Sequence, residues 1–532
     1  MNIAEILRRQ ANQHPEDIAI SDVFRRRNRD LTYAGLENAS ACAASLLHSK
    51  GLKPNDHVLI FVPMSAELYI ALTAVFRLGL IATFLDPSAG REHIENCCNL
   101  VAPQAFIGIA RAHLLRLMSP ALRRIPHKFS TDFSVPAALR LQHPAQLQRQ
   151  AHFEIKPCAE EAPALVTFTS GSTGKAKALV RTHNFLLQQH QVLEKNLNLA
   201  AGDKELCALP IFVLANLASG VTSIIPDADL RRPGLVDAKK IISQIAMQSP
   251  TRAAGPPAFF ERLCEYSESN RVTCPTVKAV YTGGAPVTPR LMERLRRVVP
   301  NADVVAVYGS TEAEPIAHVA HHEISAADRA GMRNVKGLLA GLPVPEIELR
   351  IVPDRWGTPF SSYNAAEFAE LSLPAGASGE VVVSGSHVLG SYLHKQHDDE
   401  TKFKVDGMVW HRTGDAGYLD ERGRLWLLGR CAARLQDERG VLYPLPVECA
   451  VQEIPGIRRA AFVAHRQRRT LVIEPVEPNS FSSPDETLEE LKKMLDWARI
   501  DDIVTVRRLP VDKRHNSKTD YPVLQRLLEM RK

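Results

Sequence analysis

Residues 164–177 read Ala164-Leu165-Val166-Thr167-Phe168-Thr169-Ser170-Gly171-Ser172-Thr173-Gly174-Lys175-Ala176-Lys177. The run 164–168 is short and largely apolar, which is typical of a buried β-strand. The residues after it are small, hydroxylated or basic. Small residues let backbone N–H groups turn toward one anion, while hydroxyl and ammonium groups add donors and positive charge. The stretch therefore predicts a strand that ends in a phosphate-binding loop.

This loop does not match the Walker A pattern of kinases and related nucleoside triphosphatases. That pattern requires a glycine six residues before the lysine and Ser or Thr directly after it. Here Thr169 and Ala176 occupy those two positions around Lys175. A plain Gly/Ser turn without a ligand is the alternative that the stretch by itself leaves open.

The chain on both sides of this loop alternates between helical and strand-like patterns. Strand-like runs occur at 57–62, 105–109, 277–282 and 304–308, with helical segments between them. Such alternation predicts an α/β fold with βαβ units and parallel sheets. After about residue 340 the strands are short and separated by Gly/Pro turns, which favours a small antiparallel subdomain. The last part, from about residue 434, predicts a small α+β domain.

The composition excludes several classes of protein. The 532 residues are 45% apolar and carry a net charge of +6, and no basic stripe interleaved with aromatic residues points to nucleic acid. Nine cysteines, none in a C-x-x-C pair, favour reduced thiols in a cytoplasmic protein over a zinc site or a disulfide framework. The N-terminus predicts an amphipathic helix that contains charged residues, which a signal peptide lacks.

Two local patterns lead to further predictions. The apolar stretch 68–85 contains Arg77 and Gly79, which favours a core helix, a turn and a buried strand over a transmembrane span. The basic run 25–29 lies between strand-like stretches and predicts a solvated hairpin tip, with an anionic docking site as the alternative. Directly after it, Thr32 is a candidate cap for a helix.

Further motifs follow the loop along the chain. They are Gly283-Gly284-Ala285-Pro286, Tyr308-Gly309-Ser310-Thr311-Glu312, His411-Arg412-Thr413-Gly414-Asp415, Gly429-Arg430 and the stretch 509–520 with Lys518. Together with the 169–177 loop they resemble the acyl-adenylate-forming (AMP-dependent synthetase/ligase) superfamily, and they occur in that family's order. The resemblance covers nearly the whole chain, with one departure in the loop, where Ala176 replaces the usual proline.

The resemblance implies ATP and Mg²⁺ as cofactors and a carboxylic acid with an acyl chain as substrate. It assigns the nucleotide to Thr169, Ser170, Gly171, Ser172, Thr173, Gly174, Lys175, Lys177, Gly283, Gly284, Ala285, Pro286, Tyr308, Gly309, Ser310, Asp415 and Arg430. It makes Lys518, Glu312 and Thr311 catalytic, with Glu312 on the metal, and Lys518 rather than Lys513 fits the position of the family's lysine. The chemistry agrees, because magnesium prefers hard oxygen ligands and an ionised carboxylate such as Asp415 accepts from both hydroxyls of a ribose.

The resemblance also implies a domain organisation. An N-terminal adenylation domain would span 1–430, a hinge 431–433, and a mobile C-terminal lid 434–532. The lid would carry Lys518 toward the nucleotide and away from it.

Several positions depart from the pattern of the CoA ligases. Ala432 stands at the hinge position, Val213 replaces a histidine that many ligases carry, and Glu438 with Arg439 replaces small glycines that line a pantetheine channel. Residues 437–440 predict a hairpin turn. These departures resemble the β-lactone synthetases of bacterial long-chain olefin biosynthesis. The same branch is similar at 84–87, 105–109, 209–213, 225–227, 311–315, 424–426 and 442–444, and at Pro446 and Glu448.

That branch adenylates a β-hydroxy acid, whose own hydroxyl then closes a β-lactone without a thiol channel. We therefore expect activation of a long-chain β-hydroxy acid to acyl-AMP, followed by lactone closure, with the acyl pocket around 212–217 and on the apolar side of 283–315. The resemblance also implies partner enzymes of the same pathway. The alternatives are an acyl-CoA or acyl-carrier-protein ligase, an adenylating enzyme that loads another acceptor, and, from a different class, a nucleotide-binding pseudoenzyme.

Overall fold

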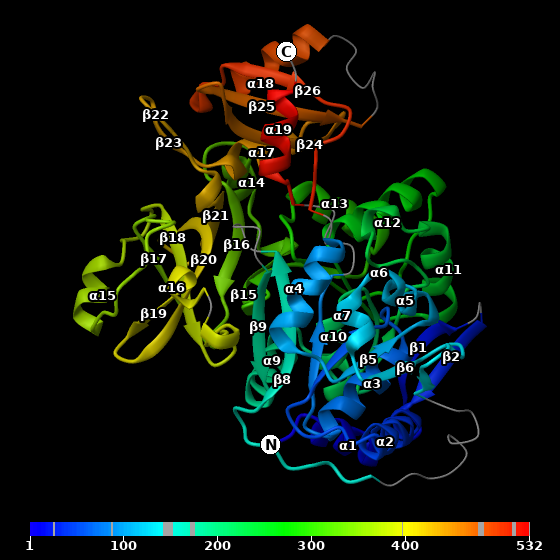
Figure 1. Cartoon of the computed structure of the whole chain (residues 1–532). Helices are drawn as coiled ribbons and strands as arrows, with labels where there is room; N and C mark the ends of the chain where they lie inside the picture. The colour runs from blue at the N-terminus through cyan, green and yellow to red at the C-terminus, as the bar shows by residue number, and fades with distance from the viewer. Residues whose placement is uncertain are drawn as a thin grey trace. The chain divides into compact units, whose positions relative to one another are not determined.

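The computed structural model describes residues 1–24, 27–86, 89–141, 153–170, 176–395, 397–476, 484–512 and 518–530 (Figure 1). The chain divides into two compact units. The first comprises Met1–Leu230, Met247–Ala254 and Leu389–Asp398, and the second comprises Arg231–Ala246, Gly255–Val388 and Asp399–Lys532.

The first unit contains a seven-stranded sheet in the order β7-β6-β5-β3-β4-β8-β9. Its strands are β3 (His57–Phe61), β4 (Ile81–Phe84), β5 (Ala105–Gly108), β6 (His127–Ser130), β7 (Leu139–Arg140), β8 (Pro163–Ser170) and β9 (Ala176–Thr182). Neighbouring strands are parallel except β8 and β9, which are antiparallel. Helices join the parallel strands, as the alternating pattern predicts: α3 (Ala66–Arg77), α4 (Arg91–Val101), α5 (Ala110–His113), α6 (Leu115–Met118) and α7 (Pro120–Arg124).

A second group of strands in the first unit has the order β12-β10-β11-β1-β2. They are β1 (Ile18–Phe24), β2 (Arg27–Thr32), β10 (Lys204–Cys207), β11 (Thr222–Ile224) and β12 (Arg252–Gly255). All adjacent pairs are parallel except β1 and β2. The unit also contains α1 (Ala4–Gln13), α2 (Tyr33–Ser49), α9 (His183–Asn196) and α10 (Pro210–Ala218).

Several sequence predictions are confirmed in this unit. Thr32 caps α2, because its hydroxyl oxygen accepts from the Gly35 N–H at 3.1 Å. The stretch 68–85 forms the core helix α3 and the strand β4, with Gly79 between them at φ +66°. The N-terminal helix α1 buries Ala4, Leu7 and Ala11 on one face.

The basic run at 25–29 differs from its prediction. β1 and β2 do form an antiparallel hairpin, but β2 already begins at Arg27. Arg29 is not a solvated tip residue: its guanidinium lies 2.6 Å from the buried Asp22 carboxylate and also binds Glu67. The hydrophobic pattern could not reveal these contacts, because Asp22 lies on the paired strand β1 and Glu67 on the helix α3. Arg25 and Arg26 lie outside the described residues.

The second unit begins with two parallel strands and continues as a mostly antiparallel sheet. The antiparallel part is predicted after about residue 340, but antiparallel pairing already begins with the strand Ala313–Ala320. The order is β17-β18-β20-β21-β16-β15-β14-β13, and β19 pairs with β20. These strands are β13 (Ala279–Gly283), β14 (Asp303–Ser310), β15 (Ala313–Ala320), β16 (Leu338–Pro343), β17 (Ile347–Val352), β18 (Gly379–Gly385), β19 (Lys402–Val405), β20 (Met408–Leu419) and β21 (Leu425–Arg430). The accompanying helices include α12 (Pro257–Asn270), α13 (Pro289–Val298), α14 (Ala326–Met332) and α15 (Ala365–Leu371).

The C-terminal part of the second unit is the predicted α+β segment, drawn in orange and red in Figure 1. A three-stranded sheet has the order β24-β25-β26. The elements are the hairpin β22 (Leu435–Asp437) and β23 (Gly440–Leu442), then α17 (Pro444–Gln452), β24 (Ile457–His465), β25 (Arg468–Pro475), α18 (Pro484–Met494), β26 (Asp502–Thr505) and α19 (Tyr521–Glu529).

The two faces of this small sheet bury different helices, because successive side chains of a strand point to opposite faces. Phe462 and Leu471 belong to a core cluster that includes Val447 of α17 and Leu491 of α18. On the other face, Val463 packs with residues of α19. The mixed α/β fold class with a C-terminal α+β part is therefore confirmed. In the described part of the chain, the helices are too short or too polar to cross a bilayer.

Candidate active site

The carboxyl ends of β13 and β14 meet at one edge of the sheet in the second unit. The two strands are parallel, and Gly283 pairs with Val307, the residue before Tyr308. A Cβ atom on Gly283 would lie 2.4 Å from the Val307 carbonyl oxygen, so only glycine fits there. Gly284 has φ +83°, a conformation that favours glycine. The motif at 283–286 therefore opens a tight turn beside the motif at 308–312.

Tyr308, Asp415 and Arg430 form one polar cluster. The Tyr308 hydroxyl donates to Asp415 Oδ2 at 2.7 Å, and Arg430 Nε lies 3.2 Å from Asp415 Oδ1. Asp415 and Arg430 face each other across β20 and β21. Burial and the Asp415 carboxylate raise the pKa of Tyr308, so its hydroxyl remains a donor at neutral pH. Three residues that the sequence assigned to one nucleotide thus lie together.

The Asp415 carboxylate can accept further hydrogen bonds from a ligand. An ionised carboxylate has about four acceptor sites, and Tyr308 and Arg430 each take one. The Arg430 side chain is 48% exposed, so it can reach a ligand as well. This donor and acceptor set fits the predicted contacts with a ribose diol and a phosphate.

A buried ion pair supports the strand that carries Asp415. Arg412 Nη2 lies 2.6 Å from Glu380 Oε2, and both side chains are almost fully buried. Arg412 also donates to the Thr358 carbonyl oxygen at 2.7 Å. Next along β20, the Thr413 hydroxyl accepts from the Asp415 N–H at 3.0 Å and donates to the Val381 carbonyl oxygen at 2.8 Å. These contacts hold Arg412 and Thr413 in place, and the Thr413 hydroxyl in turn fixes the Asp415 backbone.

The turn between β14 and β15 carries Thr311 and Glu312, both half-buried. Ser310 Oγ accepts from the Ala313 N–H at 3.2 Å and closes the turn. Asp415 is the main cause of the raised pKa of Arg430, and the charges of Tyr308 and Glu312 add to it. The Glu312 carboxylate therefore lies within electrostatic reach of the cluster.

The predicted phosphate loop connects two paired strands in the first unit. β8 extends to Ser170, two residues beyond the predicted strand, and Thr169 and Ser170 pair with Lys177 and Ala176 of β9. The Lys177 side chain is buried, with Nζ 5.9 Å from the centroid of the Tyr392 ring. The predicted contacts of Gly171, Ser172, Thr173, Gly174 and Lys175 lie outside the described residues.

Two hydrogen bonds to Asp512 fix the main chain of Lys518. Its N–H donates to Asp512 Oδ1 at 3.0 Å, and its carbonyl oxygen accepts from the Asp512 N–H at 2.8 Å. The next residues outward, Val511 and Thr519, form an antiparallel bridge. We call this arrangement the Asp512–Lys518 clasp. Residues 513–517, including the alternative Lys513, lie outside the described residues.

Comparison with known proteins identifies the family. A family model described as AMP-binding enzyme matches residues 7–393. The chain belongs to the AMP-binding enzyme family. It is 30% identical to an olefin β-lactone synthetase of Stenotrophomonas maltophilia over 97% of this chain and 96% of the relative. It is 29% identical to an olefin β-lactone synthetase of Xanthomonas campestris over 97% and 95%. It is also 27% identical to an indoleacetate–CoA ligase of Aromatoleum aromaticum over 90% and 89%.

Solved structures agree on the fold of this AMP-binding enzyme. ATP-bound MatB from Rhodopseudomonas palustris superposes with a TM-score of 0.80 at 20% identity, over 100% of this chain and 99% of that chain. At this identity the likeness concerns the fold alone.

In this AMP-binding enzyme the helix after Lys518 is held by a buried carboxyl group. The Tyr521 hydroxyl, at the start of α19, lies 2.6 Å from Glu448 Oε1 on α17. The Phe462 N–H donates to the same oxygen at 3.0 Å. Burial raises the pKa of Glu448 to about 7. Sequence reasoning used Glu448 only as a point of resemblance and missed this contact, because α17 and α19 are far apart in the chain.

Asp354 holds the segment that follows the predicted hinge. Arg434 Nη1 lies 3.0 Å from Asp354 Oδ2, and the Tyr443 hydroxyl donates to the same oxygen at 2.8 Å. Between Arg430 and Arg434, a short 3₁₀ turn spans Cys431–Ala433. The sequence gives no sign of this contact, since Asp354 lies in the loop after β17, far from Arg434 and Tyr443 in the chain.

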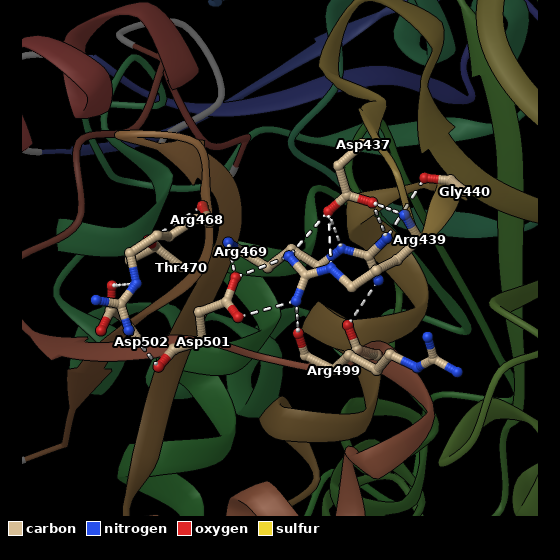
Figure 2. Close-up of polar contacts among 10 residues, drawn as sticks. Asp437, Arg439, Gly440, Arg468, Arg469, Thr470, Arg499, Asp501 and Asp502 are labelled. Atoms are coloured by element: carbon tan, nitrogen blue, oxygen red, sulfur yellow. Dashed lines mark hydrogen bonds and ion pairs between the residues drawn. The ribbon is translucent and has the colours of Figure 1, made fainter.

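The β22–β23 hairpin confirms the predicted turn at 437–440, with Glu438 and Arg439 as its two loop residues. Figure 2 shows how charged residues attach it to the rest of the C-terminal segment. Asp437 Oδ1 lies 2.7 Å from Arg469 Nη2, and Arg439 Nη2 lies 2.8 Å from Asp501 Oδ2. Hydrogen bonds from Arg469 and Arg439 lower the pKa of Asp437 to about 2. The hairpin turn is therefore charged, and ion pairs join it to Arg469 and Asp501 of the same C-terminal segment.

The residues present fit a magnesium ion that is held mainly by nucleotide phosphates. Such an ion needs only one or two protein carboxylates, and water and phosphate oxygens complete its shell. Glu312 supplies a carboxylate on the turn that follows the strand of Tyr308. Within the described ranges, no group of three or more His, Cys, Asp or Glu side chains forms a metal site of its own.

Proposed function

We propose that this AMP-binding enzyme uses ATP and Mg²⁺ to convert a long-chain β-hydroxy carboxylic acid to acyl-AMP and then to a β-lactone. The observation that carries the proposal is the similarity to two olefin β-lactone synthetases, which extends over 97% of the chain. The charged β22–β23 turn supports it, because a lactone-forming enzyme needs no opening there for a thiol.

The first step must bring two anions together. A carboxylate oxygen of the substrate attacks the α-phosphorus of ATP, the bond from that phosphorus to the bridging oxygen breaks, and pyrophosphate leaves. Positioned positive charge lowers the barrier of such a transfer, because it offsets the charge on the phosphate oxygens. We assign Lys518, Arg430 and the donors of the 169–177 loop to this role. Bound Mg²⁺ would neutralise further phosphate charge, with Glu312 as its protein ligand.

The second step closes the ring within the substrate. The β-hydroxyl oxygen attacks the carbonyl carbon of the acyl-AMP, the bond to the phosphate oxygen breaks, and AMP leaves while the hydroxyl proton passes to solvent. An intramolecular nucleophile is already close to the carbonyl, so no second substrate must be bound. We propose that an adenylation domain, 1–430, binds the substrates of this reaction, and that a lid, 434–532, moves about a hinge at 431–433.

An acyl-CoA ligase is the second candidate, and the 27% identity to an indoleacetate–CoA ligase favours it. The same adenylate would then be attacked by the thiolate of CoA. A protein that binds nucleotide without turnover is the candidate from another class. For either enzyme we propose a cytoplasmic location, since all nine cysteines are free thiols.

A single set of incubations separates these functions. The protein is supplied with ATP, Mg²⁺ and either a β-hydroxy fatty acid or the same acid without the hydroxyl, each with and without CoA. We expect pyrophosphate release with the hydroxy acid and a lactone that forms without CoA. A thioester product, or equal complete turnover of the acid without a hydroxyl, contradicts lactone formation. ATP binding without any pyrophosphate would indicate the pseudoenzyme.

A further inference from the structure

One surface of the first unit exposes an unusual group of apolar side chains. α5 and α6 are joined by Leu114, which also has helical dihedral angles, so 110–118 is one helical stretch. Ala112 and Leu115 on one side of it pack against the core cluster of the seven-stranded sheet. On the opposite side, Leu114, Leu117 and Met118 are 60%, 76% and 63% exposed. Their spacing of three and four residues places them on one helical face.

The neighbouring segment 131–139, a loop that ends at the first residue of β7, adds two more exposed apolar residues. Phe133 is 55% exposed and Leu139 is 44% exposed. The loop contacts the helical stretch directly, because Arg116 Nη1 donates to the Pro136 carbonyl oxygen at 3.2 Å. Asp132 Oδ1 in turn accepts from the Ala110 N–H at 2.7 Å. The five apolar side chains therefore belong to adjoining segments, which we call the 114–139 face.

The charge around this face is strongly positive. Residues 110–141 contain six basic side chains and one acidic side chain, Asp132. They form most of the excess in a chain whose net charge is +6. Arg111 and Arg123 are exposed and make no ion pair with the described residues. The nearby Glu95 accepts from Ser119 and from the Ala121 N–H, so its carboxylate is turned toward α7. α5, α6 and α7 are neighbours on the surface (Figure 1).

We propose that the 114–139 face binds the surface of an anionic lipid bilayer. Peripheral membrane sites combine exposed aliphatic and aromatic side chains, which enter the boundary of the acyl chains, with basic residues that contact lipid headgroups. Charge complementarity selects an anionic bilayer over a neutral one. The exposed residues at the helix are aliphatic, which suits acyl chains better than the stacked bases of nucleic acid. The face repels a second copy of itself, since both would carry the same charge.

The inference does not depend on the proposed reaction, so it is tested by binding. The full-length protein is sedimented with vesicles of equal parts phosphatidylglycerol and phosphatidylcholine, and with phosphatidylcholine alone. We expect most of the protein to pellet only with the anionic vesicles, and less at high NaCl, because salt screens the attraction. Removing two basic residues with Arg111→Gln and Arg123→Gln should weaken binding about 30-fold, at about a factor of five for each charge.

Matched substitutions elsewhere provide the controls. Lys239→Gln with Arg422→Gln removes two exposed charges outside the face, and should leave vesicle binding unchanged. Leu114→Ser, Leu117→Ser and Met118→Ser should abolish binding, whereas Leu235→Ser, Met247→Ser and Met530→Ser, which are equally exposed, should not. All variants should keep the ATP-dependent release of pyrophosphate with a short soluble acid.

Three results would overturn the proposal. The first is equal binding to neutral and anionic vesicles. The second is equal loss of binding in the face variants and in the matched controls. The third is a change of oligomeric state in light scattering when Leu117 is replaced, with vesicle binding unaffected. That last result would instead identify the 114–139 face as a contact between copies.

Discussion

Asp415 is the central residue of the candidate nucleotide site, because both Tyr308 and Arg430 contact its carboxylate. Tyr308 and Arg430 orient it from two sides, and Thr413 fixes its backbone. A carboxylate that is already oriented loses little conformational entropy when it accepts ligand hydroxyls. We therefore expect small changes in its partners to affect nucleotide affinity before they affect the chemical step.

Tyr308→Phe tests this expectation. The substitution keeps the ring and removes the hydroxyl that donates to Asp415 Oδ2. Since one hydrogen bond is worth about 1 kcal/mol, the KM for ATP should rise by a factor of about 5 with little change in kcat. Tyr418→Phe is a matched control on β20, because its hydroxyl donates to the Lys336 carbonyl oxygen instead. An unchanged KM in Tyr308→Phe would mean that Asp415 does not contact the nucleotide.

Lys518→Ala tests the assignment of the catalytic lysine. It removes a positive charge that we place on the phosphate, so pyrophosphate release should slow by a factor of about 100 or more. ATP affinity, measured separately by calorimetry, should change much less. Lys513→Ala is the comparison. Normal pyrophosphate release in Lys518→Ala and a slow Lys513→Ala would reverse the assignment.

Single residues also show what the sequence could predict. Tyr308, Asp415 and Arg430 were assigned by motif, and they lie together. Arg412 belonged to a quoted motif, but its buried partner Glu380 could be found only once β18 and β20 were known to be paired. Long-range pairs of this kind leave no periodic trace in one sequence. The same reason explains why Arg29 was placed at a solvated tip.

At the scale of elements, α19 is attached to α17 through Glu448 and Tyr521. Burial raises the pKa of Glu448 to about 7 from an ordinary value of 4.5. The folded state therefore binds a proton that the unfolded chain has released between these pH values. Stability should be greatest below the unfolded pKa and should fall as the pH rises toward 7, by up to about 3 kcal/mol.

Glu448→Gln should remove this pH dependence, because the amide does not ionise. The measurement is urea unfolding of the full-length protein, followed by tryptophan fluorescence, at pH 5 and at pH 8. The same change at the exposed Glu438 is the control and should leave the wild-type slope. If Glu448→Gln keeps the full difference between the two pH values, another group is responsible.

The β22–β23 hairpin provides a second test at this scale. Asp437→Ala would leave the buried Arg469 guanidinium without its main carboxylate partner, which is costly for a desolvated charge. Hydrogen exchange of the 440–442 amides should become markedly faster. Asp502→Ala removes the partner of the exposed Arg468, a pair that contributes little, and is the control. Similar exchange rates in the two variants would contradict the structural role of Asp437.

For the molecule as a whole, the sequence predicted the order of helices and strands along the chain. It did not predict which strands distant in sequence pair with each other. Alternating helices and strands predicted the parallel sheets, and the C-terminal α+β segment was predicted at the correct place. The antiparallel part begins at β15, earlier in the chain than its prediction. Strand order depends on contacts between residues hundreds of positions apart, such as β1 with β11. A local hydrophobic pattern carries no information about such partners.

Removal of the metal is a test of the whole enzyme. Because the described residues contain no cluster of metal ligands, magnesium should act on the nucleotide and not on folding. Chelation with EDTA should therefore stop pyrophosphate release and leave the melting temperature in the absence of ATP unchanged. Addition of Mg²⁺ should restore the activity fully. A fall in the melting temperature upon chelation would point to a structural metal.

The Asp512–Lys518 clasp has a consequence for mutational tolerance. One of its two hydrogen bonds is accepted by the Asp512 carboxyl group, and the other joins the main chains of both residues. Only a side chain with an acceptor at the same distance can replace Asp512 without losing the first bond. In a saturation library at position 512, most members should therefore lose pyrophosphate release, and the few that keep it should carry such an acceptor.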